Sequence, residues 1–382
     1  MGQSNILSSC HKKQELPLIP SSSSFTQSDR NSYQLKHKIG PYLNRTDSDH
    51  YKLKEWNNIL QTTNFQDFDL EKELIQKYHH CTFPLEKSLQ TYYIISKQHY
   101  INLIKQGPPS KLRWAAWKSI LLKNQYPYNY HGSSELINKD IKRTLINHPF
   151  FQTTNDNYTI AHLQLYNILQ ALVNIYPILG YCQGMNFIAG FLLLVSGGDE
   201  YYSFQCLVTL FAHPKFMLYF NYDSKFQLLG FLEFITQKLL LKYQPQLYKH
   251  LNSQLKFPES FWLTKIILTL FLYNLQLQYC LRIWDYIIVE GIFYLPSLII
   301  TILDQFQSQI LAINEFSEIA IWFQQLDQQS LNVHGLDDSN KYRLQKHEIQ
   351  QYAKEYRKEL PLIEQLQSYP KGLSNFLKDM LN

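Results

Sequence analysis

The sequence is short of the features that mark nucleic-acid-binding, disulfide-bonded and metal-binding proteins. Its net charge of +5 comes from 36 basic and 31 acidic residues with no long basic run, so nucleic acid is not an expected partner. The five cysteines are scattered without any CxxC spacing, so neither a disulfide framework nor a structural zinc site is predicted. The adjacent residues His79, His80 and Cys81 would point in diverging directions on a helix, so no metal site is expected there.

Long uninterrupted hydrophobic runs are also missing. The most apolar stretch, residues 261–303, is broken at short intervals by Lys265, Arg282, Asp285 and Glu290. Because charges are costly in hydrocarbon, this stretch predicts buried helices of a soluble protein rather than membrane spans. Solubility of the chain without detergent would test the membrane-protein alternative. The first residues carry no basic segment followed by an apolar one, so no secretory signal is expected, and a reducing cytosol fits the cysteine usage.

What the sequence does have is the composition of a packed globular protein, with 45% hydrophobic, 15% aromatic and 18% charged residues. Residues 1–50 include four consecutive serines and no apolar periodicity, so they are predicted to form a disordered polar tail. From residue 51 onward, apolar residues recur at three- and four-residue spacing without strand-like alternation. The predicted fold class is therefore all-α.

Two predicted helices, Thr159–Tyr176 and Met185–Ser196, enclose a short connector. The first helix ends before a proline and the second ends at a Gly-Gly pair. The connector, residues 177–184, contains Gln183, whose amide can both donate and accept hydrogen bonds, and has glycines at positions 180 and 184. Such an amide can approach another molecule and position a water. The alternative is a polar turn between two core helices, in which the glycines serve geometry alone.

A third predicted helix carries a charged pair near its end. The helix is predicted to start after Ser134 and to run through Thr144 before His148-Pro149 ends it. Asp140 and Arg143 lie three residues apart and therefore on one face, where the carboxylate can orient the guanidinium group. An arginine held in this way near a helix C-terminus can reach a partner molecule. The alternative is an ordinary surface ion pair.

These two motifs belong to a longer series that runs through residues 103–326. The series opens with Gly-x-Pro-x3-Arg-x3-Trp at residues 107–117, continues with Ile-x2-Asp-x2-Arg-Thr at 137–144, and then has Tyr-x-Gln-Gly-Met at 181–185. It closes with Tyr-Gln-Pro-Gln-Leu at 243–247, Phe-Trp-Leu at 261–263, and Arg-Ile-Trp-Asp at 282–285 followed by a glycine at 291. In order and extent, the series resembles the TBC-domain family of Rab GTPase-activating proteins.

The resemblance implies a two-lobed, all-α domain whose groove receives the nucleotide face of a Rab-type small GTPase. By similarity, Arg143 is an arginine finger that neutralises charge on the transferring γ-phosphoryl group, and Gln183 is a glutamine finger that orients the attacking water. GTP and Mg²⁺ are then held by the partner, so no cofactor is expected on this chain, which also lacks a GxxxxGK[ST] loop. The chain is expected to be a GTPase activator and not an enzyme with its own active site.

Five further residues receive supporting roles from the resemblance. Asp140 would hold Arg143, while Tyr181 and Gly184 would shape the loop that presents Gln183.

The remaining two, Arg113 and Trp117, would brace the lobes together with Arg282 and Asp285, because indoles and paired charges usually serve packing.

The sequence departs from the family pattern at three positions. Trp114 stands where the family often has glycine, and Leu145-Ile146 stand where an aromatic residue and proline usually follow the arginine motif. These departures keep open a second hypothesis, in which the chain is a catalytically weak binding module or scaffold of the same fold that recruits a Rab or an adaptor. The presence of both Arg143 and Gln183 favours the activator.

The predicted organisation has four parts. These are a disordered polar tail (1–50), a helical N-terminal extension (51–102), a TBC domain (103–335), and C-terminal helices packed on the second lobe (336–382). The extension belongs either to the first lobe or to a separate docking element. The resemblance also implies a cytoplasmic protein at the periphery of endomembranes and vesicles, which contacts membrane only through its lipidated GTPase partner.

Overall fold

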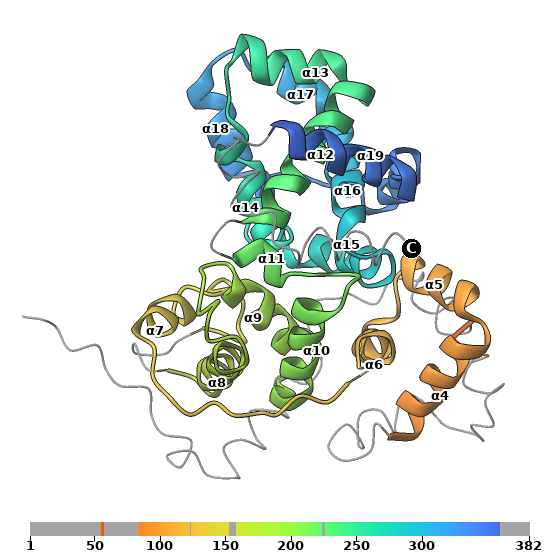
Figure 1. Ribbon diagram of the computed structural model, residues 1–382, viewed down its shortest axis with the longest axis vertical. Helices are drawn as coiled ribbons and strands as arrows, with labels where there is room; N and C mark the ends of the chain where they lie inside the picture. The colour runs from red at the N-terminus through yellow and green to blue at the C-terminus, as the bar shows by residue number, and fades with distance from the viewer. Residues whose placement is uncertain (1–54, 57–82, 123, 153–157, 224–225, 360–382) are drawn as a thin grey trace, which may run out of the picture.

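The structure is a computed structural model that describes residues 55–56, 83–122, 124–152, 158–223 and 226–359. All regular elements in these residues are helices, which confirms the predicted all-α class. They form two lobes, one above the other in Figure 1. The predicted tail, the adjacent residues 79–81 and the last 23 residues of the predicted C-terminal part (360–382) lie outside the described residues.

The first lobe is the lower one in Figure 1. Its helices are α4 (Phe83–Ile95), α5 (Lys97–Gln106), α6 (Ser110–Leu121), α7 (Glu135–Ile141), α8 (Ile160–Ile175), α9 (Met185–Val195) and α10 (Glu200–Ala212). Helices α8, α9 and α10 pack on one another and form the centre of this lobe. Helix α4 packs against α6, so the described part of the predicted N-terminal extension lies on the body of the molecule.

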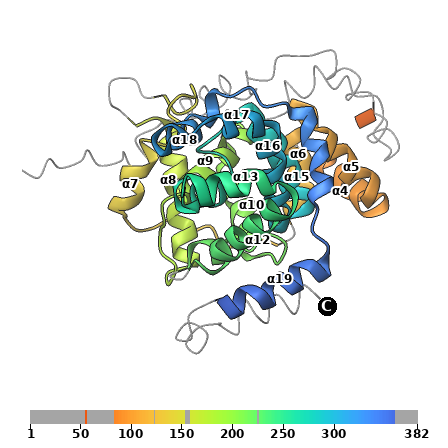
Figure 2. The same cartoon turned by 90° about the horizontal axis from the view of Figure 1, so that it is seen from above.

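The second lobe meets the first at two junction helices, α11 (Tyr219–Tyr222) and α15 (Leu277–Glu290). Its α-helices are α12 (Gln227–Tyr243), α13 (Pro245–Lys249), α14 (Leu263–Thr269), α16 (Leu295–Gln305), α17 (Gln307–Ala312), α18 (Phe316–Gln324) and α19 (Lys346–Glu359). Short 3-10 or π-helical segments are η2 (His250–Gln254), η3 (Glu259–Phe261), η4 (Ile292–Tyr294), η5 (Leu326–Gln328) and η6 (Val333–Tyr342). Helix α12 packs on α16, which also contacts η6, and α19 lies beside α12 (Figure 2).

Local sequence explains the ends of α8. Thr159 caps its N-terminus: the Oγ1 atom accepts from the backbone N–H of His162, and His162 Nδ1 accepts from the backbone N–H of Thr159. This reciprocal arrangement is a capping box with histidine in the usual Glu or Gln position. The helix then ends two residues before Pro177, because proline cannot continue it. The predicted range 159–176 agrees with α8 to within one residue at each end.

Helix α7 is shorter than predicted. The sequence predicted a helix through Thr144, but α7 ends at Ile141, so Arg143 lies in the turn beyond the helix. The backbone N–H of Thr144 bonds to the carbonyl oxygen of Ile141, only three residues back, and Leu145 has a left-handed φ of 49°, which a continuing helix excludes. The prediction was wrong because the periodicity of apolar residues does not report a backbone that tightens into a turn or adopts a left-handed conformation.

One buried carboxylate joins three helices at the junction of the lobes. Asp285 of α15 has no exposed surface. It accepts from Arg113 of α6 at 3.2 and 3.3 Å, from Trp117 Nε1 of α6 at 2.9 Å, and from Arg282 of α15 at 2.8 Å. Arg282 also donates to the carbonyl oxygen of Lys105 in α5. The carboxylate therefore connects α6, α15 and α5.

Removal of this carboxylate should strongly destabilise the fold. Asp285→Ala would leave Arg113, which is 5% exposed, as a buried charge without its partner, at a cost of about 3–5 kcal/mol. Urea unfolding measures this loss. Asp338→Ala is the control, because it breaks the exposed Lys341–Asp338 pair and should cost at most about 1 kcal/mol. Equal effects of the two substitutions would contradict the central role of Asp285.

The α8 cap should make stability depend on pH. Burial and the nearby Lys142 lower the pKa of His162 to about 4. The unfolded chain binds this proton at the ordinary histidine pKa of about 6.5, so the stability that neutral His162 contributes is complete above that pH and is lost as pH falls towards 4. The free energy of unfolding should change by at most about 1.4 kcal/mol per pH unit from this group.

His162→Gln isolates this contribution, since Gln keeps an acceptor for the cap but does not titrate. The unfolding free energy of wild type should fall relative to that of the variant between pH 6.5 and 4.5. Parallel pH profiles would refute the prediction.

Candidate functional site

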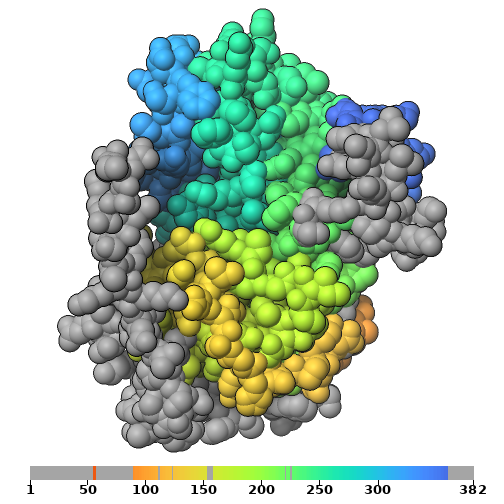
Figure 3. All heavy atoms as spheres, turned by 60° about the vertical axis from the view of Figure 1, so that its left-hand side comes forward, coloured from red at the N-terminus to blue at the C-terminus, as the bar shows by residue number. Residues whose placement is uncertain are grey.

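A groove of about 1010 Å³ lies between the two lobes. Residues 143, 145–149, 182–184 and 187 line it from the first lobe, and several residues between 260 and 278 line it from the second lobe and the start of α15. Phe226 and Asp327 complete its lining. Figure 3 shows the first lobe, in yellow and light green, meeting the second lobe, in teal and blue. Arg143 and Gln183 both line this groove, so the structure brings the two predicted finger residues to one surface.

In the turn after α7, a carboxylate binds one edge of the Arg143 guanidinium group while the side chain stays exposed. Ser134 caps the start of α7 by accepting from the backbone N–H of Ile137. Arg143 Nη2 lies 2.6 Å from Asp140 Oδ1, and the arginine side chain is 55% exposed while that of Asp140 is 8% exposed. A buried carboxylate therefore fixes one edge of the guanidinium group, and the other N–H groups, which bond to no other residue in the described part of the chain, can meet a ligand.

The second oxygen of Asp140 binds the connector that carries Gln183. Tyr181 donates its hydroxyl to Asp140 Oδ2 at 2.6 Å. Burial and this hydrogen bond to a carboxylate raise the pKa of Tyr181 well above its ordinary value, so the phenol remains a donor at neutral pH. One carboxylate thus positions both the arginine and the segment that presents the glutamine.

A second bridge joins the same two segments, and sequence reasoning missed it. Asn186, which is fully buried at the start of α9, donates to Thr144 Oγ1 at 2.8 Å and accepts from the backbone N–H of Gly184 at 3.0 Å. The bridge therefore runs from the residue after Arg143 to the residue after Gln183. A polar residue in the otherwise apolar segment 185–195 was the available signal.

Gly184 is required by its backbone and its neighbours. It precedes α9 with a φ of 111°, which side-chain-bearing residues rarely adopt. A Cβ atom there would lie 3.4 Å from the ring of Tyr222 and 3.5 Å from the carbonyl oxygen of Leu268. Tyr222 of α11 donates its hydroxyl to that same carbonyl oxygen, which belongs to α14. The connector that carries Gln183 thus touches a contact between the lobes.

The other predicted supporting residues lie away from the groove. Arg113 and Trp117 contact Asp285 and are absent from the groove lining. Trp114, one of the departures from the family pattern, is buried in α6. Leu145 and Ile146 do line the groove, and Ile146 is 53% exposed.

The part of the chain that the structure describes contains no group of three or more His, Cys, Asp or Glu side chains arranged to hold a metal ion. None of its described helices is long and apolar enough to cross a membrane.

The fold and groove define an all-α, two-lobed protein with an arginine and a glutamine presented at one interlobe surface. The sequence matches the model of the Rab-GTPase-TBC domain over residues 110–311, which is more than half of its 382 residues. The chain therefore belongs to the Rab-GTPase-TBC domain family, as its motifs predicted.

Curated relatives match about half of the chain. It is 29% identical to the Rab GTPase-activating protein eat-17 of Caenorhabditis elegans over 228 residues, which cover 57% of this chain and 25% of the relative. It is 32% identical to the GTPase-activating protein GYP5 of Eremothecium gossypii over 198 residues, which cover 50% of this chain and 22% of the relative. The chain thus spans about a quarter of the length of these relatives.

Two solved structures share the fold. The Chlamydomonas flagellar RabGAP TBC domain superposes with a TM-score of 0.54 at 18% identity, covering 79% of this chain and 97% of that one. The Ypt/Rab-GAP domain of Gyp1p superposes with a TM-score of 0.52 at 16% identity, covering 65% of this chain and 91% of that one.

Loss of the Asn186 bridge should destabilise the protein. Asn186→Ala would leave the buried N–H of Gly184 without its acceptor, at a cost of about 1–3 kcal/mol in unfolding free energy. Asn314→Ala is the control, because Asn314 is an exposed amide bonded to a carbonyl group two residues away. If chemical denaturation gave both variants the same stability, the bridge would contribute nothing.

Proposed function

We propose that this chain is a GTPase-activating protein for a Rab-type small GTPase and that it supplies Arg143 and Gln183 to the partner's active site. The observation that carries the proposal is the double use of Asp140, which bonds Arg143 with one oxygen and Tyr181 with the other at the edge of the interlobe groove. A merely structural surface ion pair needs no such connection to a second, glutamine-bearing segment. The relatives named as GTPase-activating proteins support the same assignment.

Arg143 would act by electrostatic stabilisation. Phosphoryl transfer needs little covalent help from a protein and depends on positioning and on neutralising charge in the transition state, for which an arginine finger supplies about 10³–10⁵ in rate. The guanidinium group of Arg143 is exposed at the groove yet fixed by Asp140, so little side-chain freedom is lost when it meets the phosphoryl oxygens.

Gln183 would position the attacking water. It is exposed in the connector before α9, and its neighbour Gly184 lets the backbone turn closely past Tyr222. An amide can accept from the water while donating to a phosphoryl oxygen, which suits it to hold a nucleophile in line. No acid–base role is required of the chain.

The proposal assigns GTP and Mg²⁺ to the partner, so this chain needs no cofactor of its own. It places the protein in the cytoplasm at the surface of endomembranes and vesicles, with membrane contact made through the lipidated GTPase. Nucleic acid has no part in it.

The two fingers can be tested by single-turnover GTP hydrolysis on a panel of purified Rab proteins. Arg143→Ala should lower the accelerated rate by about 10³-fold, and Gln183→Ala by about 10²-fold, as for the loss of one transition-state contact. Arg143→Lys should recover only part of the rate, because an ammonium group lacks the planar fork of arginine.

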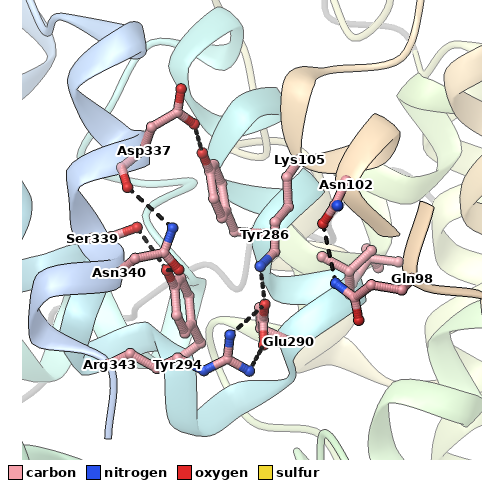
Figure 4. Close-up of polar contacts among 12 residues, drawn as sticks. Gln98, Asn102, Lys105, Tyr286, Glu290, Tyr294, Asp337, Ser339, Asn340 and Arg343 are labelled. Carbon is pink, nitrogen blue, oxygen red and sulfur yellow. Dashed lines mark hydrogen bonds and ion pairs between the residues drawn. The ribbon is translucent and has the colours of Figure 1, made fainter. Parts of the chain in front are cut away.

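Figure 4 contains matched controls for both residues. Arg343 pairs with Glu290 much as Arg143 pairs with Asp140, and Gln98 is an exposed glutamine bonded to Asn102. Neither residue lines the groove, so Arg343→Ala and Gln98→Ala should retain the wild-type rate.

A Rab that binds tightly while no panel member is accelerated would replace the activator with the binding-module alternative. The left-handed Leu145 and the exposed Ile146, which follow Arg143 directly, would then be the first residues to restore to the family pattern.

A further inference from the structure

The second-lobe wall of the groove carries a cation of its own. Lys265 of α14 is exposed and lines the groove, and its Nζ atom lies 4.1 Å from the ring centroid of Tyr273. Tyr273 lines the same groove and is 49% exposed. Its ring packs edge-to-face on Phe187 of α9, with centroids 5.5 Å apart. The ammonium group therefore rests on an aromatic platform that is itself supported by the first lobe.

Lys265 differs from Arg143 in its partners. Arg143 is paired with Asp140, whereas among the described residues no carboxylate forms an ion pair with Lys265. The charged residues that line the groove are Arg143, Lys265 and Asp327. The groove thus offers one cation on each wall, and the cation on the second-lobe wall forms no ion pair with Asp327 or any other described carboxylate.

We propose that Lys265, held on Tyr273, binds an acidic side chain of the GTPase and thereby helps to select it. The inference rests on the proposed function, since it concerns the same groove and the same partner. A protein that brings its nucleotide to Arg143 on one wall must cover the opposite wall, where Lys265 lies among Leu268, Leu272 and Tyr273. An acidic residue with apolar neighbours is complementary to this wall.

The free energy of binding should favour GTPases that place an acidic residue against Lys265. Contact with the Tyr273 ring restricts the lysine before the partner arrives, so less side-chain entropy is lost on binding. A partner without an acidic residue at this point would bury the ammonium group unpaired, which is costly. The wall would therefore reject such partners as well as attract the correct one.

The test is single-turnover hydrolysis with the activator in excess, which gives a maximal rate and a half-saturating concentration. Lys265→Glu should raise the half-saturating concentration by about tenfold or more and leave the maximal rate unchanged, because the contact acts on binding of the partner and not on the transferring phosphoryl group. It should also reduce the salt dependence of the second-order rate.

Lys249→Glu is the matched control. It makes the same charge change at an exposed residue of α13, which does not line the groove. A charge swap completes the test: among lysine substitutions of acidic surface residues on the GTPase, one should be rescued by Lys265→Glu.

The outcomes separate this inference from the proposed function. If Arg143→Ala abolishes acceleration while Lys265→Glu matches Lys249→Glu, the fingers stand and the lysine contact is refuted. If Lys265→Glu lowers the maximal rate and leaves the half-saturating concentration unchanged, the lysine acts on the phosphates. The proposed contact with an acidic side chain of the GTPase is then refuted.

If the wild-type chain accelerates no GTPase, the proposed function fails. Equilibrium titration with GTPases loaded with a non-hydrolysable GTP analogue then decides on Lys265. Weaker binding by Lys265→Glu than by Lys249→Glu supports the contact. Equal binding by the two variants, or the absence of binding by wild type, overturns it.

Discussion

A carboxylate removed from water must be surrounded by donors, and this constraint organises the junction between the lobes. Asp285 has no exposed surface, and the two arginines and the indole that satisfy it come from α6 and α15. Arg282 extends the same network to the end of α5. A buried donor left unpaired would lower the free energy of unfolding. The network therefore fixes α5, α6 and α15 in one arrangement relative to one another. The groove lies beside this junction, and its second wall includes the first residues of α15.

Asp140 also requires donors for its oxygens, and in meeting this requirement it joins two segments of the groove. It is mostly buried, and its two oxygens are bound by Arg143 and Tyr181, which belong to segments about forty residues apart. The Thr144–Asn186–Gly184 bridge joins these segments a second time. Two connections of different chemistry restrict both translation and rotation of one segment relative to the other. Such preorganisation suits residues that must meet a transition state without rearrangement.

Local patterns predicted the helices where local interactions decide them. The ends of α8 follow from a cap at Thr159 and from Pro177, both of which are readable in sequence. The end of α7 did not follow, because the backbone N–H of Thr144 bonds only three residues back, to Ile141, and Leu145 adopts a left-handed conformation. Periodicity counts apolar positions and is blind to both effects.

The functional site was likewise predicted in part from the sequence and decided in part by the tertiary structure. The sequence by itself determined the all-α class, the family and the two motifs, since these depend on residue order and spacing. Only the tertiary structure decided that one carboxylate serves both motifs, that Asn186 joins them, and that Lys265 and Tyr273 face the same groove as Arg143. The physical reason is that these contacts join residues that are distant in sequence. Their distances depend on how the lobes pack, and no local pattern records that packing.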